Sequence, residues 1–453
     1  MVKQIFKILV ALVVIGIPVG IRVLIHSFTP GFHEYEAAFF YFLSDIPLAI
    51  VSVYGYYCFF RMRHPRSLFA FLFVFLLFAL ASLLFALDTL LAFYGFFRLF
   101  LAVGFALTIR DLFFRIEDRT MLYGLILFLA FSESVLAFLQ FRFQGNVGLG
   151  FLGESPIGAL IPGTAKSILS DARVVRAYGT FLHPNILGAF LLLGLGVLMY
   201  FWFSVKIPRL VFTGKNYGKL FKKYLPVMLK TMLFSAILFV ILVGITVTFS
   251  RTAWVLSLLL VCFFGIYFLF FKKYWRQAAK LLVTVAVSVY FLLTVFSPFI
   301  APRAKVSLHE PSVTERVTHL ELGVEMLEAR PEGVGIGNEV TTAVHDGWFE
   351  GAGIRNTALF QPIHNVYLLI ATEIGIAGLV AFLFFIALVF LQNKKVTDLP
   401  LRYSNCILLA TLLVFALFDH FFWTLDQGRL MLWLTIGLLM IARTRSDAPV
   451  GTK

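Results

Sequence analysis

The chain has 453 residues, of which 60% are hydrophobic and only 14% are charged. A soluble domain of this size would carry about 25% charged residues, so the composition excludes an ordinary soluble fold. Apolar stretches of about 20 residues recur from end to end, and each is long enough to cross about 30 Å of hydrocarbon. We therefore predict an all-α polytopic membrane protein in which residues 1–453 form one integral membrane domain.

Hydropathy predicts twelve membrane-spanning helices in chain order. Their expected ranges are 6–26, 37–60, 67–87, 89–109, 121–140, 186–205, 229–249, 252–271, 281–300, 364–391, 404–423 and 428–442. Two long connections interrupt this series, a first external loop at 141–185 and a larger one at 301–363. The larger loop should contain an amphipathic helix at 314–329, which ends before the glycine-rich segment 333–338. The apolar face of that helix is expected to carry Val317, Leu320, Val324 and Leu327.

The distribution of charge predicts the orientation in the membrane. Most short connections and both chain ends are rich in Lys and Arg, including the segments 61–66 and 443–453, whereas the two long loops are mixed or acidic. An excess of Lys and Arg marks the cytoplasmic side, so we expect both termini inside and both long loops outside. The net charge of +14 then reflects topology and anionic lipid headgroups, and it gives no reason to expect a nucleic-acid partner.

Arginines and a histidine gather at the predicted external ends of four separate segments. Arg173 and Arg176 close the first loop, Arg251 lies between two spans, Arg316 lies in the amphipathic helix and His364 opens the tenth span. Guanidinium groups at this depth suit bidentate binding of phosphate or pyrophosphate. A histidine beside them is a natural general base near neutral pH. The pattern therefore predicts transfer of a group from a phosphorylated, lipid-borne donor.

Each of these residues also has a purely structural interpretation. Arginines at span ends more often reach toward headgroups than bind substrate. His364 could cap its helix, Asn185 and Asn365 could be N-caps at span entrances, and His183 could be a turn residue before Pro184. The pair Asp419-His420 looks catalytic, but its members could simply satisfy each other. The sequence has no His-Glu-x-x-His motif, no paired Cys-x-x-Cys and no acidic cluster, which indicates a metal-independent mechanism without a cofactor.

Four segments, in order across residues 173–380, resemble the O-antigen ligase / O-antigen polymerase family of bacterial membrane glycosyltransferases. They are Arg-Ala-Tyr-Gly-Thr-Phe-Leu-His-Pro-Asn at 176–185, Phe-Ser-Arg-Thr-Ala-Trp at 249–254, Glu315-Arg316 through Gly-Val-Gly-Ile-Gly-Asn at 333–338, and His-Asn-Val-Tyr-Leu at 364–368 with Glu373 and Gly375. The resemblance implies a twelve-span fold with a large periplasmic loop. It also implies a location in the bacterial cytoplasmic membrane, with the active site facing the periplasm or the outside.

The same resemblance implies an activity and roles for individual residues. A glycan on undecaprenyl pyrophosphate would be transferred to the hydroxyl of a glycan, lipid or protein acceptor. Arg176 and Arg251 would hold the pyrophosphate, Arg316 would be a supporting cation, and His364 would activate the acceptor. Arg173 also precedes the first motif and could be the equivalent residue in place of Arg176. The remaining polar motif positions would be supporting residues: His183, Asn185, Asn365 and Glu373.

The family motifs leave more than one function open. A polysaccharide ligase is the first interpretation and a polymerase the second. Some members of the family are protein O-oligosaccharyltransferases, which is a further and less favoured interpretation. A transporter for the lipid-linked glycan would use the same arginines, with the histidine as a proton relay. Against the transporter, the polar residues lie on one predicted face, no inverted repeat is visible, and Asp45, Arg98 and Glu133 look isolated within their spans.

Overall fold

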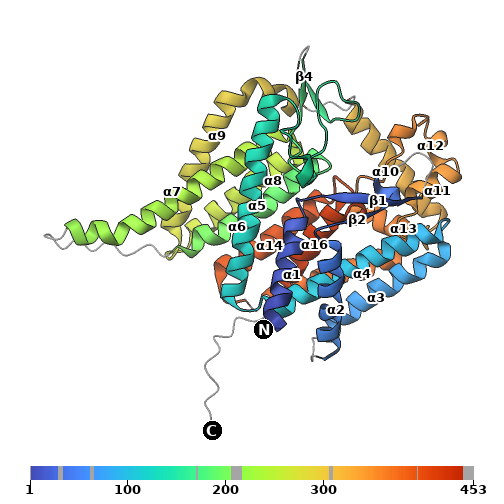
Figure 1. Ribbon diagram of the computed structural model, residues 1–453, viewed down its shortest axis with the longest axis horizontal. Helices are drawn as coiled ribbons and strands as arrows, with labels where there is room; N and C mark the ends of the chain where they lie inside the picture. Colours follow the sequence, from blue (N-terminus) through green and yellow to red (C-terminus); the bar gives the residue numbers. More distant parts are fainter. Residues whose placement is uncertain are drawn as a thin grey trace, which may run out of the picture.

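The computed structural model describes residues 2–28, 34–61, 66–169, 172–205, 217–305, 310–394 and 396–441, and the basic segments predicted at 62–65 and 443–453 lie outside them. Within the described residues the chain is a bundle of α-helices with two short antiparallel hairpins (Figure 1). The helices of the first two thirds are α1 (Val2–Gly16), α2 (Asp45–Arg61), α3 (Arg66–Ala81), α4 (Thr89–Leu112), α5 (Ile116–Phe143), α6 (Pro184–Ser204), α7 (Tyr217–Val247), α8 (Arg251–Leu269) and α9 (Trp275–Ala304).

The last third contains the large connection and the final helices. These helices are α10 (Pro311–Ala329), α11 (Glu339–His345), α12 (Trp348–Gly351), α13 (Val366–Asn393), α14 (Leu399–Phe415), α15 (Phe421–Thr424) and α16 (Asp426–Leu439). The hairpins pair β1 (Arg22–Ser27) with β2 (Ala37–Tyr41), and β3 (Lys166–Leu169) with β4 (Ala172–Val175). Hairpin β3–β4 and helices α10 to α12 lie at one end of the bundle, which we call the loop end (Figure 1).

Eight helices in the described part of the chain are long and apolar enough to cross a membrane: α3 with the turn that follows it, α4 to α9, and α13. This confirms the prediction of an all-α polytopic membrane protein. Helices α1, α2, α14 and α16 fall on the other four predicted spans but have only 15, 17, 17 and 14 residues. The number twelve therefore stays a prediction.

The first two predicted spans have wrong boundaries. Residues 22–27 and 37–41, which were expected to be helical, form the β1–β2 hairpin instead. Helix α1 ends at Gly16, two residues before Pro18, because proline has no backbone N–H to continue the helical hydrogen-bond series. Residues 22–27 and 37–41 pair as strands, and α2 begins only at Asp45.

Helix α6 lies at the centre of the bundle and almost all of its side chains are buried. Figure 1 shows α7, α8 and α9 on one side of it and α2, α3, α4 and α13 on the other. Gly188 lets α8 approach closely, because a Cβ atom at this position would lie 2.9 Å from the Cβ of Ala253. Small residues of this kind are the usual means of close helix packing in membranes. The contact holds the first turns of α6 and α8 side by side at the loop end.

The glycine-rich segment 333–337 packs its backbone against a break in α13. Gly375 has φ 82°, outside the helical region, and the freed backbone bonds across to the segment: Val334 N–H donates to Thr372 O at 2.9 Å and Gly335 N–H to Glu373 O at 2.9 Å. A Cβ atom at Gly333 would lie 2.6 Å from Glu373 O, so a side chain has no room there. This contact fixes the large connection onto α13, which begins two residues after His364.

The predicted amphipathic helix exists as α10, and Leu320 and Leu327 of its predicted apolar face are half-buried, but the prediction is wrong for the two valines. Val317 and Val324 are 45% and 46% exposed, whereas Leu322 and Met326 are buried. The reason is Gly323, which allows α10 to lie directly on the segment before α13: a Cβ atom there would meet the side chain of Ile363 at 2.5 Å. The face around Gly323 therefore packs inward, and the valines turn outward.

The buried charges of α2, α4 and α16 are paired with one another. Arg98 contacts Asp45 and Asp426 at 2.8 Å each, and Arg429 contacts Asp426 at 2.8 Å. Asp45 and Arg98, which looked isolated in the sequence, therefore form one network near the loop end. Charges in a low-dielectric setting are stable only when paired in this way.

We predict that Arg98→Met destabilises the fold strongly, because it leaves Asp45 without its cation. Removing one member of a buried pair costs about 3–5 kcal/mol. Lys7→Met is the matched control, since Lys7 pairs with Asp118 at 2.6 Å but both side chains are partly exposed, and such pairs contribute about 1 kcal/mol or less. Thermal unfolding of the purified protein in detergent should show a clearly lower midpoint for Arg98→Met alone, and equal midpoints for both variants would contradict the role of the network.

Candidate functional site

A polar cavity of about 520 Å³ lies at the loop end, where α6, α8, α9, α10 and the segments before α13 and α15 meet. Four arginines, three histidines and two carboxylates contribute to its lining: Arg176, Arg251, Arg303, Arg316, His183, His364, His420, Glu315 and Asp419. These side chains come from segments that are far apart in the sequence. The cavity is therefore a product of the fold and not of a single motif.

The segment that carries Arg176 is held by polar side chains of α5. Gln140 Oε1 accepts hydrogen bonds from the backbone N–H groups of Tyr178 and Gly179 at 3.0 and 2.8 Å. Glu133 accepts from the backbone and the hydroxyl of Thr180 at 3.0 and 2.8 Å. Gly179 has φ 60° and a Cβ atom there would lie 2.1 Å from the Glu133 carboxylate, so only glycine fits. The family-like motif at 176–185 thus owes its shape to α5.

The tight turn between α7 and α8 presents backbone carbonyls to two of the arginines. Phe249 has φ 50°, an uncommon conformation for a residue with a side chain, and it reverses the chain directly before Arg251. Arg176 Nε donates to Thr248 O at 2.8 Å, and Arg303 Nε donates to Phe249 O at 3.4 Å. The same turn therefore positions Arg176, Arg251 and Arg303 around one wall of the cavity.

Glu310 joins two of these arginines at the start of α10. Its carboxylate accepts from Arg251 Nη2 at 2.8 Å and from Arg303 Nη1 at 2.6 Å. The other terminal nitrogen of Arg251, Nη1, is buried and has no hydrogen-bond partner among the described residues. A buried donor without a partner is uncommon in a folded protein and marks a place where a further acceptor is expected.

The cavity has a positive electrostatic potential. Burial lowers the pKa of Arg176 to about 9, with a smaller effect of Arg303, so the guanidinium still carries its charge at neutral pH. The first turns of α6 and α8 also point into the cavity, and helix N-termini favour anions. Four arginines against two carboxylates in the lining, together with these helix ends, suit a multiply charged anion.

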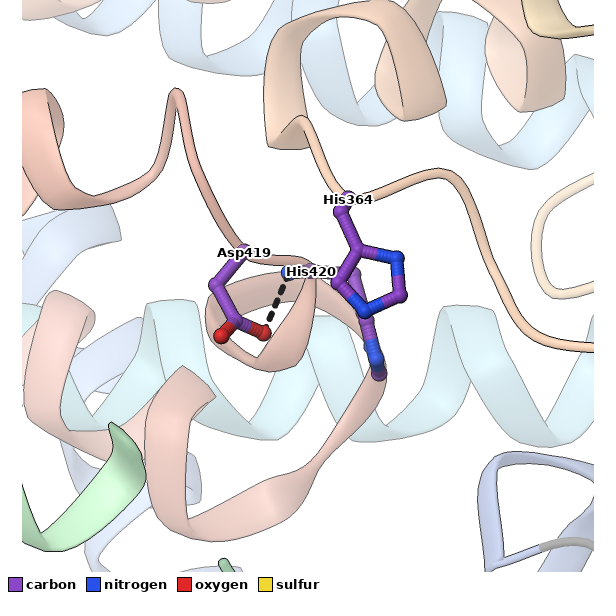
Figure 2. Close-up of side chains that lie close together, drawn as sticks. All are labelled: His364, Asp419 and His420. Carbon is purple, nitrogen blue, oxygen red and sulfur yellow. Dashed lines mark hydrogen bonds between the residues drawn. The ribbon is translucent and has the colours of Figure 1, made fainter. Parts of the chain in front are cut away.

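In a second group of lining side chains, which we call the histidine wall, His364 lies beside Asp419 and His420, as Figure 2 shows. The rings of His364 and His420 meet edge to face with centroids 5.0 Å apart, and His319 stacks on the other side of His364 at 5.7 Å. The Nδ1 atom of His364 is buried without a hydrogen-bond partner among the described residues. His364 also lines the cavity, and a neutral imidazole has a nitrogen lone pair that can accept a proton from a hydroxyl that enters there.

A chain of hydrogen bonds links this histidine wall to the arginine wall. Asp419 Oδ2 accepts from Asn185 Nδ2 at 2.7 Å, and Asn185 Oδ1 accepts from Arg176 Nη2 at 2.8 Å. Asp419 Oδ1 accepts from the backbone N–H of His420 at 2.9 Å. Asn185 therefore fixes Asp419 and Arg176 relative to each other, and it is more than the N-cap that its position at a span entrance suggested.

The protonation states of these groups favour a base next to a carboxylate. Burial, followed by the neighbouring His420, lowers the pKa of His364 well below 6.5. Burial alone would raise the pKa of Asp419, but its interactions with His420, His364 and Arg316 outweigh burial and lower it to about 2. At neutral pH the site thus holds a neutral His364 beside an anionic Asp419.

The three side chains are also close enough to bind a metal ion, since one ligand atom of each of His364, Asp419 and His420 lies within 4.8 Å of the others. The side chains of Asp419 and His420 already make hydrogen bonds within the protein, however. Both Asp419 oxygens accept hydrogen bonds from Asn185 and the His420 backbone, and His420 Nδ1 bonds the Thr424 hydroxyl at 2.7 Å. These hydrogen bonds fix the orientation of Asp419 and His420 beside His364.

Most of the site residues predicted from the sequence line the cavity, namely Arg176, His183, Asn185, Arg251, Arg316 and His364. The other three lie elsewhere. Arg173 is exposed on β4, Asn365 caps α13 by accepting from the N–H groups of Tyr367 and Leu368, and Glu373 accepts from the Trp423 indole inside the bundle at 2.6 Å. Between the two candidates for the first arginine, the cavity thus contains Arg176 and not Arg173.

Arg303, Asp419 and His420 line the cavity although the sequence analysis did not select them. Asp419 and His420 form a pair that looks catalytic in the sequence, and their position at the predicted external end of a span is the feature that could have indicated a place in the site. Arg303 follows Pro302, and the sequence predicts it in the external loop because the predicted span ends at residue 300. Helix α9 continues to Ala304, which places Arg303 in its last turn.

Comparison with known proteins gives a match to one family. Residues 235–383 match the family model described as O-antigen ligase, and this region includes Arg251, Arg303, Arg316 and His364. Comparisons with curated proteins and with solved structures found no match. The match confirms the family resemblance inferred from the motifs and supports an enzyme of the ligase or polymerase type that acts on lipid-linked glycans. The chain is thus a multi-pass membrane protein whose residues 235–383 are similar to the O-antigen ligase family.

Proposed function

We propose that the chain is an O-antigen ligase-like glycosyltransferase. It moves a glycan from undecaprenyl pyrophosphate to an acceptor hydroxyl, with the loop end at the outer face of the cytoplasmic membrane. The observation that supports this proposal is that one cavity is lined both by four arginines, one of which, Arg251, has an unsatisfied nitrogen, and by a neutral His364.

The arginine wall would bind the pyrophosphate of the donor. Arg176 and Arg251 would contact its oxygens, and Arg303 and Arg316 would add charge from α9 and α10. Guanidinium groups bind phosphate oxygens through paired hydrogen bonds, and they are already in place when negative charge develops on the leaving group. Glu310 now accepts hydrogen bonds from Arg251 and Arg303, so the incoming pyrophosphate would compete with this carboxylate.

The histidine wall would activate the acceptor. His364 would take the proton of the acceptor hydroxyl, and the oxygen would attack the anomeric carbon of the donor sugar. The bond from that carbon to the pyrophosphate oxygen breaks, and undecaprenyl pyrophosphate leaves with the electron pair. Asp419 would stabilise the imidazolium that forms, since its carboxylate is ionised beside the ring. We propose no metal in this sequence of steps, because fixed cations and a base supply the required chemistry.

A polymerase of the same family would use the same cavity, with a growing glycan as the acceptor. The two activities differ in the acceptor alone, and the arginine and histidine walls serve both. A transporter fits the structure less well. Asp45 and Arg98, which a transport path would need as mobile polar groups, are tied together in a buried ion-pair network.

We predict that His364→Ala lowers kcat for glycan transfer by about 10²–10⁴-fold, the usual contribution of a general base. Donor binding should change little, because a neutral His364 adds no charge to the arginines that would bind the pyrophosphate. The measurement is transfer in proteoliposomes with an undecaprenyl-pyrophosphate-linked glycan. His345→Ala is the matched control, since His345 is 64% exposed and outside the cavity. Transfer at the wild-type rate by His364→Ala would exclude it as the base, and a loss of wild-type transfer on adding EDTA would exclude the metal-independent mechanism.

The low pKa of His364 predicts the pH profile. The base must be neutral, and a lowered pKa keeps it neutral as the pH falls through the ordinary value of 6.5. We therefore expect kcat/KM for the acceptor to stay level from about pH 8 to about pH 6. At about pH 6 an unperturbed histidine would already have more than half of its imidazole protonated and inactive as a base. An acid limb centred at or above 6.5 would contradict the neutral base that the buried ring implies.

We predict that Arg176→Ala and Arg251→Ala each raise the KM for the donor by about 10- to 100-fold, because each removes charge-assisted hydrogen bonds to pyrophosphate. Arg173→Ala should leave it unchanged, since Arg173 is exposed on β4 and does not line the cavity. Donor titration in the same transfer assay measures these values. Unchanged donor KM in both cavity variants, or a large effect of Arg173→Ala, would overturn the assignment of the arginine wall.

A further inference from the structure

A second cavity, apolar and about 170 Å³ in volume, lies between α7, α8 and α9. Its floor is formed by buried side chains such as Val261, Val285 and Leu292. Leu258 and Leu293 stand at its rim and are 49% and 52% exposed. Because these helices cross the membrane, the cavity is a groove that opens sideways toward lipid. We call it the α8–α9 groove.

The groove lies on the same helix faces as two of the arginines of the polar cavity. On α8, Trp254, Leu258 and Val261 follow Arg251 at intervals of three, seven and ten residues, which places them in one stripe below it. On α9, Ile300 and Leu293 precede Arg303 at intervals of three and ten residues. Helix α8 begins and α9 ends at the loop end, so both stripes run away from the arginines into the membrane.

The two arginines meet at the upper end of these stripes. Glu310 accepts hydrogen bonds from both Arg251 and Arg303, which brings the two guanidinium groups together. Just below, the Trp254 indole donates to the carbonyls of Ile245 and Thr246 at 3.1 and 3.2 Å. The indole is thus fixed to the end of α7, between the charged groups and the groove. With a rise of about 1.5 Å per residue, the stripes extend about 15 Å below Arg251 and about 27 Å below Arg303.

We propose that the α8–α9 groove binds the prenyl chain of the lipid pyrophosphate donor. This inference rests on the proposed function and adds where the lipid part of the donor lies. A lipid pyrophosphate needs a cationic site near an apolar path that is open to the membrane, and Arg251 and Arg303 line the polar cavity at the ends of the two helices whose stripes line the groove. The chain enters sideways between Leu258 and Leu293, and the pyrophosphate then reaches the arginine wall without leaving the membrane surface.

A second apolar groove offers a matched control. It has a volume of about 390 Å³ and lies between α2, α3 and α4, where Leu77 is 46% exposed at its edge. Its lining residues come from the later parts of α2 and α4, beyond Val53 and Phe96, and none of them lines the polar cavity. This groove is larger, but it does not lead to the arginine wall. It should hold ordinary membrane lipid.

The test compares two donors that carry the same glycan, one on undecaprenyl pyrophosphate and one on dimethylallyl pyrophosphate, whose five-carbon chain is too short to reach Leu258. Leu258→Trp fills the α8–α9 groove at a lipid-facing position, and Leu77→Trp fills the control groove. We expect Leu258→Trp to raise the KM for the undecaprenyl donor by about tenfold, the equivalent of about 1.4 kcal/mol, and to leave kcat/KM for the dimethylallyl donor nearly unchanged. Leu77→Trp should affect neither donor.

A binding measurement checks the same point without activity. A photo-crosslinking residue at position 258 should label added undecaprenyl pyrophosphate in competition with unlabelled compound, and one at position 77 should label bulk phospholipid alone. Equal effects of Leu258→Trp on both donors, no effect on the undecaprenyl donor, or labelling at 258 by phospholipid that undecaprenyl pyrophosphate does not displace would overturn the proposal. If the wild-type protein transfers no glycan from either donor, the proposed function fails instead.

Discussion

The convergence of four guanidinium groups in one partly buried cavity is the constraint on which the rest of the structure depends. Like charges in a medium of low dielectric repel each other strongly, and desolvation adds to the cost. Arg176 is held by a backbone carbonyl and by the amide of Asn185, neither of which neutralises it. The carboxylate of Glu310 is shared between Arg251 and Arg303. The positive potential thus remains available to an anion that enters from outside.

Several unusual features of the fold serve this arrangement. The left-handed Phe249 turns the chain so that α8 begins with Arg251, and Gly179 lets the Arg176 segment lie on Glu133 of α5. The glycine contact between Gly333 and the break at Gly375 fixes the large connection to α13 and so sets the position of His364. Strained or crowded backbone of this kind is typical of sites whose geometry must be fixed. The same positive surroundings help to keep His364 neutral and Asp419 ionised, which links the two walls electrostatically.

The sequence predicted the class of fold well because membrane hydropathy is a local property. Each long apolar helix follows from its own residues. The β1–β2 hairpin was missed because its strands are as apolar as a span, and only Pro18 signals the end of α1. Part of the buried face of α10 was missed because Gly323, and not the apolar residues, decides which side contacts the segment at Ile363.

Within the candidate site, the residues that belong to motifs could be found from the sequence, and those that act through tertiary contacts could not. Arg303 reaches the cavity only because α9 continues past Pro302. Asp419 gains its place through a bond to Asn185, which is 234 residues away in the chain. Glu373, in contrast, belongs to a motif but contacts Trp423 inside the bundle. The motifs therefore predict which segments form the site, and tertiary contacts determine which of their residues line the cavity.

The most direct test of the account is an experimental structure of the protein with undecaprenyl pyrophosphate bound. The account predicts density for the two phosphates within hydrogen-bond distance of Arg176 and Arg251, with the Glu310 carboxylate displaced from at least one arginine. Pyrophosphate bound away from the arginine wall, with Arg251 still paired to Glu310 and its Nη1 atom still without a partner, would contradict it.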